Sequence, residues 1–241
     1  MRSIGILLIS LFAVTSWAAD EISATEAKIK EAMKGEVRTD ADTARDRNRK
    51  PVQTLNFFGL RDDMKVLELV PGGGWNTKIL APVLADKGKL FLSIGAERLN
   101  DRLLNKPGFE KVKVLTADLK SPPLDFGEKN FDMVLTFRNL HNFPPEGRQN
   151  INAAAFKALK KGGLYGVVDH TRRHMESDTR ANGRRMDPVL VIKELEAEGF
   201  EFVDFSTLHY RVDDELRYEV GVRSVTGNTD RFTMLFRKPK R

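Results

Sequence analysis

A cluster of glycines follows a short, largely apolar run in the first third of the chain. Val66–Leu69 form that run, and Gly72, Gly73 and Gly74 come shortly after it. Glycines at such a position let the backbone approach a ligand closely, and the N-terminus of a following helix offers unpaired N–H groups. The complete G-x-G-x-x-G pattern of dinucleotide sites is absent, because Thr77 stands at its third glycine. The cluster therefore predicts a ligand loop and disfavours nicotinamide and flavin cofactors.

Three titratable side chains follow two later apolar runs. His141 comes after Phe131–Phe137, and Asp169 and His170 end the run that begins at Leu164. Ligands of open α/β sheets bind beyond the carboxyl ends of the strands, so we expect these side chains to face one crevice. A histidine can take the proton of a hydroxyl or amine nucleophile near neutral pH. His141, Asp169 and His170 are predicted to be catalytic, while a structural role for either imidazole is the alternative.

No metal site is predicted at these runs. Asp169, His170 and His174 are ligand types that suit several divalent ions, and the two histidines have i, i+4 spacing. However, neither capping nor apolar periodicity indicates that this segment is helical. The chain also has no cysteine, which excludes disulfides, thiolate metal ligands and a cysteine nucleophile.

Short apolar strands alternate with amphipathic helices from residue 64 onward. The expected strands are Lys65–Leu69, Lys89–Ile94, Val112–Thr116, Phe131–Phe137, Leu164–Asp169, Phe200–Phe205 and Arg231–Phe236. The expected helices are Thr77–Ala85, Gly147–Leu159 and one that begins at Pro188 and ends by Gly199. This alternation predicts an α/β fold, a doubly wound Rossmann-like domain with a mostly parallel seven-stranded sheet. The last two strands are expected to form an edge pair with a long polar insertion between them.

The N-terminus has the pattern of a secretory signal. Arg2 precedes the apolar run Ile4–Val14, and Ser16–Ala18 forms a small-x-small cleavage site. We therefore expect residues 1–18 to be a signal peptide that is cleaved after Ala18, and a periplasmic or secreted protein. No later stretch reaches the ~18 apolar residues that a membrane span requires.

Residues 19–59 precede the alternating pattern and are expected to form an N-terminal helical extension or lid on a domain of residues 60–241. Within the extension, Arg47 or Arg49 could meet an anionic group, although surface ion pairing is the favoured interpretation. The formal net charge is +6. Nucleic acid is disfavoured as a partner, because no basic stripe is interleaved with aromatic residues.

The glycine loop resembles the first motif of the class I S-adenosylmethionine-dependent methyltransferases, in which an acidic residue at a strand end precedes spaced glycines. Glu68 takes the acidic place, and Val70 stands where that superfamily usually has its first glycine. The segment Pro71–Trp75 is similar to a group of predicted bacterial methyltransferases that carry a signal peptide.

Later segments follow in the order that the resemblance requires. Ala117–Leu119 follows the third strand, Asn139 follows the fourth, and Lys160–Leu164 resembles the turn before the fifth. The second strand departs from the pattern, because Leu92–Gly95 contains no acidic residue for the ribose hydroxyls and Glu97 is displaced. The resemblance implies S-adenosylmethionine as the cofactor. The residues implied to bind it are Glu68, Pro71, Gly72, Gly73, Gly74, Trp75, Asp118, Leu119 and Asn139.

The function implied is methyl transfer to an unidentified acceptor, for which a small molecule is expected. The alternative is an exported, non-catalytic binding protein, a degenerate methyltransferase that uses the same pocket. Export favours this alternative, because S-adenosylmethionine is made in the cytosol.

Overall fold

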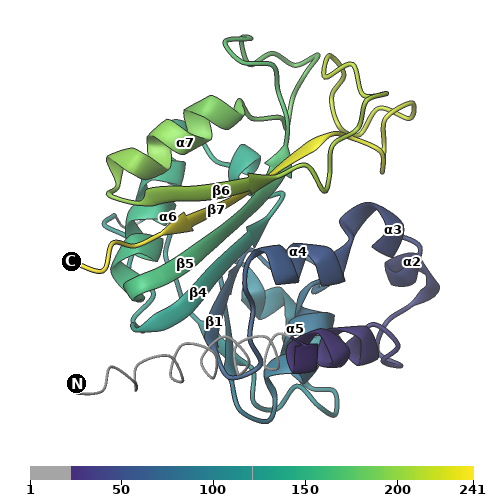
Figure 1. The fold of residues 1–241 in the computed structure, drawn as a ribbon, viewed down its shortest axis with the longest axis vertical. Coiled ribbons are helices and arrows are strands. Elements are labelled where there is room, and N and C mark those ends of the chain that lie inside the picture. The colour runs from purple at the N-terminus through teal and green to yellow at the C-terminus, as the bar shows by residue number, and fades with distance from the viewer. Residues whose placement is uncertain (1–22, 121) are drawn as a thin grey trace, which may run out of the picture.

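A seven-stranded sheet forms the centre of the computed structural model, which describes residues 23–120 and 122–241 (Figure 1). The strand order is β3-β2-β1-β4-β5-β7-β6. All neighbouring strands pair in parallel except β7, which runs antiparallel to both β5 and β6. The strands are β1 Lys65–Leu69, β2 Lys89–Ser93, β3 Lys113–Leu115, β4 Phe131–Phe137, β5 Leu159–His170, β6 Glu201–Ser206 and β7 Arg231–Arg237. The predicted mostly parallel seven-stranded sheet is confirmed.

Helices cover both faces of this sheet. Figure 1 shows α6 and α7 on one side of the sheet, and α4 and α5 on the other. Residues 23–32 are also helical. The remaining helices are α2 Asp40–Thr43, α3 Asp46–Arg49, α4 Pro51–Phe57, α5 Thr77–Leu84, η1 Ala96–Leu99, η2 Asn100–Leu104, η3 Leu140–Asn142, α6 Pro145–Ala158 and α7 Pro188–Ala197.

Successive residues of β1 enter opposite cores. Val66 packs with Leu80 of α5, whereas Leu67 and Leu69 pack in the core that contains Ile151 of α6. This is the period-two alternation of a strand that is covered on both faces. By the same alternation, Glu68 faces the α5 side of the sheet.

The N-terminal extension is part of the α5-side core. Ile29 and Phe58 are fully buried there, and the Asn56 side chain donates a hydrogen bond of 2.6 Å to Glu26. The extension therefore packs on the sheet, while its separation from residues 60–241 as a unit stays a prediction. The predicted signal peptide lies outside the described residues. Within residues 23–120 and 122–241, no helix combines the length and apolar character needed to cross a bilayer.

Two short helices, α2 and α3, precede α4 in the N-terminal extension, and Thr39 and Asp42 form a capping box that starts α2. One strand differs from its sequence-based expectation. The fifth strand begins at Leu159 instead of Leu164, and its pairing with β4 steps from Phe131↔Leu159 to Met133↔Leu164. The turn expected before this strand is therefore an irregularity inside β5.

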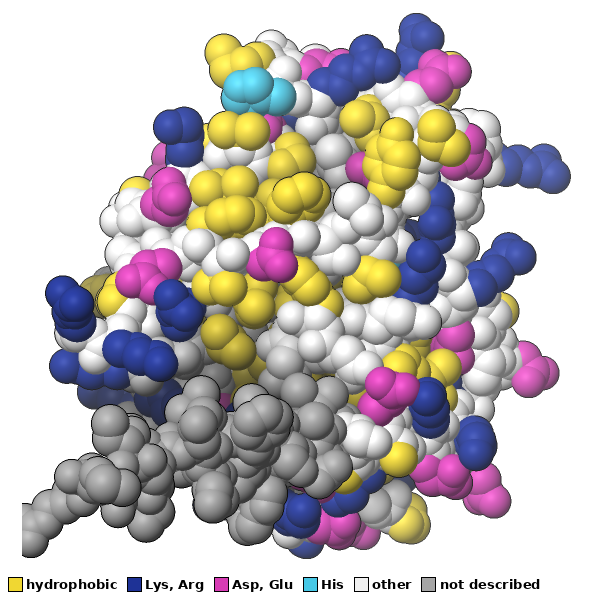
Figure 2. Space-filling view, in the orientation of Figure 1, with side chains coloured by type: hydrophobic (Ala, Val, Ile, Leu, Met, Phe, Trp, Pro, Cys, Tyr) yellow, Lys and Arg dark blue, Asp and Glu magenta, His cyan; other side chains and the backbone are white. Residues whose placement is uncertain are grey.

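The edge strand β6 is solvent-exposed along most of its length. Its larger apolar side chains Phe202, Val203 and Phe205 are 37%, 39% and 60% exposed. On the face shown in Figure 2, Lys and Arg side chains occupy several separate groups instead of one continuous stripe.

Candidate functional site at the carboxyl ends of the strands

The glycine loop turns sharply out of β1. Val70 has φ +52° and Gly72 has φ +58°, so both lie in the left-handed region. A β-branched residue rarely adopts this conformation, and Val70 occupies the position at which glycine would be unstrained. Ile94, at the end of the neighbouring β2, has φ +60°. Strained backbone of this kind clusters at functional sites, and here it flanks one cavity on both sides.

That cavity has a volume of about 500 Å³ and is lined by the glycine loop, the end of β2 and the η1–η2 segment. A Cβ built on Gly72 or Gly73 would meet no atom within 4 Å, so the backbone at these residues is open to a ligand. Gly74 has a different role, because a Cβ there would lie 2.6 Å from Leu103 Cδ2. Gly72 and Gly73 thus face the cavity, and Gly74 permits close packing behind it.

The polar side chains around this cavity are mainly basic. They are Lys78, Arg98, Arg102 and Lys106, together with Thr39. Lys78 forms an ion pair of 2.6 Å with Asp42, and Arg98 and Arg102 are exposed. No carboxylate lines the cavity among the described residues, and the displaced Glu97 is exposed outside it. The absent acidic residue of strand two is therefore not replaced by a neighbour in this structure.

Glu68 lies beneath the glycine loop instead of inside the cavity. Its side chain is buried, and its Oε2 accepts a hydrogen bond of 2.7 Å from Thr77 Oγ1 at the start of α5. Burial raises the pKa of Glu68 to about 7, against the opposing hydrogen bonds from Thr77 and Asn76. Glu68 therefore joins the end of β1 to the first turn of α5, which holds the loop between them.

Trp75 connects the glycine loop to the N-terminal extension. The indole Nε1 donates a hydrogen bond of 2.9 Å to the Asp42 carbonyl, and the Arg49 guanidinium lies 4.4 Å from the ring centroid. Pro71 is buried. Neither Pro71 nor Trp75 lines the cavity, so both residues support the loop from behind.

The three remaining predicted cofactor residues, Asn139, Asp118 and Leu119, lie at two different places. Asn139 donates hydrogen bonds of 2.9 Å to the Val70 carbonyl and 3.0 Å to the Phe137 carbonyl, and so ties the end of β4 to the glycine loop. Asp118 and Leu119 are exposed and do not line the cavity. Asp118 accepts a hydrogen bond of 2.9 Å from the Lys120 amide. A cofactor role for Asp118 and Leu119 stays a prediction.

The three predicted catalytic residues lie together at the ends of β4 and β5. His141 Nδ1 lies 2.5 Å from Asp169 Oδ1, and the imidazole rings of His141 and His170 are 5.5 Å apart. Asp169 is completely buried and also accepts hydrogen bonds from the amides of His141 and His170, at 3.2 and 2.7 Å. A carboxylate accepts from Nδ1–H, so the Nε2 of neutral His141 carries the lone pair and can accept a proton.

His170 is held differently from His141. Its Nδ1 lies 2.8 Å from Thr229 Oγ1, and burial, followed by the charges of Arg231 and other nearby groups, lowers its pKa well below the usual value. His170 is therefore neutral at pH 7. His174 pairs with Asp187 at 2.9 Å, away from this group. Among the described residues, no cluster of three or more His, Asp or Glu side chains could hold a metal ion.

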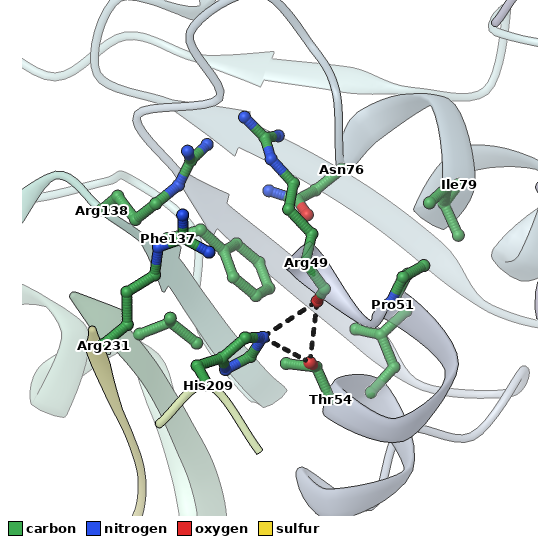
Figure 3. A pocket seen from close by; sticks show the side chains of 11 residues that line it. Arg49, Pro51, Thr54, Asn76, Ile79, Phe137, Arg138, His209 and Arg231 are labelled. Atoms are coloured by element: carbon green, nitrogen blue, oxygen red, sulfur yellow. Dashed lines mark hydrogen bonds between the residues drawn. The ribbon is translucent and has the colours of Figure 1, made fainter. Parts of the chain in front are cut away.

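The sequence pattern did not predict the arginines that lie beside the group formed by His141, Asp169 and His170. Arg49, for which surface ion pairing was favoured, is half-buried and has no carboxylate partner among the described residues, so that interpretation is wrong. Figure 3 shows Arg49, Arg138 and Arg231 approaching one another from α3, the end of β4 and the start of β7. Arg138 directly follows β4 in the sequence, which was the available signal for its position. No local sequence pattern indicated that Arg231 lies beside these residues.

Comparison with known proteins gives one relative of similar sequence. No protein-family model matches the chain. The chain is 35% identical to an uncharacterised methyltransferase of Synechocystis over 117 residues, which is 48% of this chain and 51% of that protein. The match thus spans about half the length of the curated relative.

Solved structures extend the similarity to nearly the whole chain. An S-adenosylmethionine-dependent methyltransferase from Aquifex aeolicus aligns with a TM-score of 0.60 at 19% identity, over 88% of this chain and 97% of that one. The [4+2]-cyclase SpnF aligns with a TM-score of 0.55 at 18% identity, over 80% of each chain. These two proteins are named for different activities, so their shared architecture does not specify the reaction. The chain has the Rossmann-like fold of the S-adenosylmethionine-dependent methyltransferases.

Proposed function

We propose that the chain is an S-adenosylmethionine-dependent methyltransferase that acts on a small-molecule acceptor. One observation carries the proposal. The open backbone of Gly72–Gly73 and the buried His141–Asp169 pair lie at the same edge of the sheet, at the ends of β1, β4 and β5. Asn139 links the two by its hydrogen bond to Val70. A ligand loop and a proton acceptor are thereby positioned on one rigid edge.

The cofactor would be held mainly by backbone. Gly72 and Gly73 offer a surface without side chains, and Ile94–Gly95 closes the opposite wall of the cavity. The volume of about 500 Å³ is within the range of small-molecule sites. The volume of the cavity and its exposed glycine backbone fit the group, while none of the described residues that line it supplies a carboxylate for the ribose hydroxyls.

The groups that would take the proton of the acceptor are side chains at the ends of β4 and β5. When bound, S-adenosylmethionine supplies an electrophilic methyl group on a sulfonium centre. His141 Nε2 would accept the proton of the attacking hydroxyl or amine, while Asp169 fixes the ring orientation and stabilises the resulting imidazolium. His170 stays neutral, because its ring is buried beside cationic groups.

A binding protein without transferase activity is the second candidate. The observation that favours it is the basic lining of the cavity, with Arg98, Arg102 and Lys106 where a ribose-binding carboxylate would be expected. This candidate predicts ligand binding at the same loop with no turnover.

Calorimetry on the chain that begins at residue 19 tests cofactor binding. Submillimolar affinity for S-adenosylmethionine is expected, and Gly73→Leu should abolish it by filling the open space, with Gly73→Ala weakening it less. Gly183→Ala, at a glycine that lines no described cavity, should leave the affinity unchanged. No binding at all by the folded wild-type chain would refute the proposal.

Turnover separates the transferase from the binding protein. Formation of S-adenosylhomocysteine is measured across a panel of small hydroxyl, amine and carboxylate compounds. Asp169→Asn should lower the rate by roughly 10²–10⁴-fold, because His141 loses the carboxylate that holds its proton on Nδ1 and so loses its action as a general base, with little change in cofactor affinity. Binding without turnover on any compound would favour the second candidate.

Export of the chain also remains a proposal. It is supported by the charged, apolar and small-residue order of residues 1–18. Sequencing the N-terminus of protein isolated from the cell envelope and medium should find Ala19 first.

A further inference from the structure

A second cavity of about 460 Å³ lies between the N-terminal extension and the segment that joins β6 to β7. Asn48 connects these two parts, since its side chain donates a hydrogen bond of 2.6 Å to the Gly227 carbonyl. Its lining among the described residues includes no carboxylate and six arginines, Arg45, Arg47, Arg49, Arg138, Arg184 and Arg231. His170 also lines it, which places the cavity beside the proposed catalytic group.

The three central arginines, Arg49, Arg138 and Arg231, lack the carboxylate partners that other arginines of the fold have. Arg49 and Arg138 are half-buried, and among the described residues their guanidinium groups form no ion pair or hydrogen bond, while that of Arg49 lies over the Trp75 ring. Arg231 is 6% exposed, and within the described part of the chain its guanidinium forms one hydrogen bond, of 2.8 Å from Nη1 to the Asn48 carbonyl, with the buried Nε unpaired. Unpaired buried cations are unfavourable, so this arrangement requires an explanation.

Elsewhere the same chain pairs its buried arginines with carboxylates. Arg38 contacts Asp46, Arg148 contacts Glu194 and Arg185 contacts Asp214, in each case through two nitrogens and two oxygens. These ion pairs neutralise the guanidinium charge within the fold. Of the buried arginines that the structure describes, Arg231 is the one without a carboxylate partner, and it lines the cavity.

The nearby carboxylates are already engaged. Asp42 pairs with Lys78, Asp169 with His141, and Asp230 accepts a hydrogen bond of 2.7 Å from the Arg211 amide. Burial, together with the neighbouring arginines, lowers the pKa of Arg49 to about 8 and that of Arg231 to about 10. An anion in the cavity would reverse this destabilisation of the charged forms.

We propose that this cavity binds an oxyanion group of the acceptor, a phosphate or a carboxylate, through Arg49, Arg138 and Arg231. Naming the bound molecule as the acceptor rests on the proposed function. S-adenosylmethionine itself carries one carboxylate against an ammonium and a sulfonium, so it does not supply the negative charge that three convergent arginines require. Arginine forks match phosphate and carboxylate oxygens in pairs, which fits this chemistry.

Anion binding is tested directly, without the methyl donor. The chain from residue 19 is titrated with inorganic phosphate, pyrophosphate and citrate by calorimetry, with sodium chloride added to keep the ionic strength equal. Binding of either phosphate compound or of citrate supports the proposal and identifies the preferred group. Arg49→Gln and Arg138→Gln should each weaken that binding at least about tenfold, as expected for loss of a hydrogen bond between charged groups. Arg217→Gln, at an exposed surface arginine on the same joining segment, should not.

Stability of the ligand-free protein gives a second readout. Arg138→Gln removes a charge that has no carboxylate partner among the described residues and should leave the melting temperature unchanged or higher, whereas Arg185→Gln breaks the pair with Asp214 and should lower it. The proposal is overturned if none of the anions binds, or if both cavity variants bind as tightly as the wild type. Anion binding without cofactor binding would refute only the methyltransferase assignment, and cofactor binding without anion binding would refute only the anion site.

Discussion

Replacing Glu68 by glutamine should stabilise the protein, and the stabilisation should increase with pH. Glu68 is buried between β1 and α5, and its carboxyl group is bound by Thr77 and Asn76. Glutamine has nearly the same shape and keeps an oxygen that can accept the Thr77 hydroxyl hydrogen bond. The substitution therefore removes mainly the ionisation of a buried group.

The magnitude follows from the shift of the Glu68 pKa from 4.5 to about 7. Because the folded pKa is raised, the unfolded chain loses its proton first as the pH rises, and stability is lost between about pH 4.5 and pH 7. Each pKa unit corresponds to about 1.4 kcal/mol. The glutamine variant should thus exceed the wild type by about 1 kcal/mol at pH 5 and by about 3 kcal/mol at pH 8.

Urea unfolding of the chain from residue 19 measures this difference. Trp75 is the single tryptophan of that chain and reports unfolding by its fluorescence. With a urea dependence of about 2–3 kcal/mol per molar, the midpoint gap at pH 8 should be roughly 1 M. Glu196→Gln, at an exposed glutamate of α7, is the matched control and should leave the urea midpoint unchanged at both pH 5 and pH 8. A Glu68→Gln protein that is less stable than the wild type at pH 8 would refute the reasoning, since Glu68 would then be stabilised in its ionised form.

Two further predictions concern the same edge of the sheet. Val70→Gly should change the free energy of unfolding by less than about 1 kcal/mol, because relief of left-handed strain offsets the added freedom of glycine in the unfolded chain. Val66→Gly, at a fully buried site of regular β1, should lower the free energy of unfolding by about 3 kcal/mol in the same urea titration. An equal decrease for Val70→Gly and Val66→Gly would contradict the strain argument. The pKa of His209 is lowered to about 4, chiefly by burial, so stability should be lost as the pH falls from about 6.5 towards 4. His209→Gln should remove about 2 kcal/mol of the stability loss between pH 7 and pH 5, and an unchanged pH dependence would show that this imidazole is not held neutral.

The sequence by itself determined the sheet, the glycine loop and the location of the catalytic candidates. These features depend on local patterns, since apolar runs, period-two alternation and helix caps are encoded within a few neighbouring residues. The carboxyl ends of parallel strands meet at one edge, so the proximity of His141 and Asp169 also followed once the strand sequence was recognised.

Only the tertiary structure decided the roles of individual side chains at that edge. Glu68 and Trp75 belong to the predicted loop, yet packing against α5 and the N-terminal extension turns both away from the cavity. Arg49, Arg138 and Arg231 are far apart in the sequence, and their lack of carboxylate partners depends on which elements fold beside them. The sequence shows that a residue is an arginine, but it does not show whether water or other cations surround that side chain in the fold. Burial and neighbouring charge are properties of the assembled fold, and they are what distinguish this arginine cavity from an ordinary charged surface.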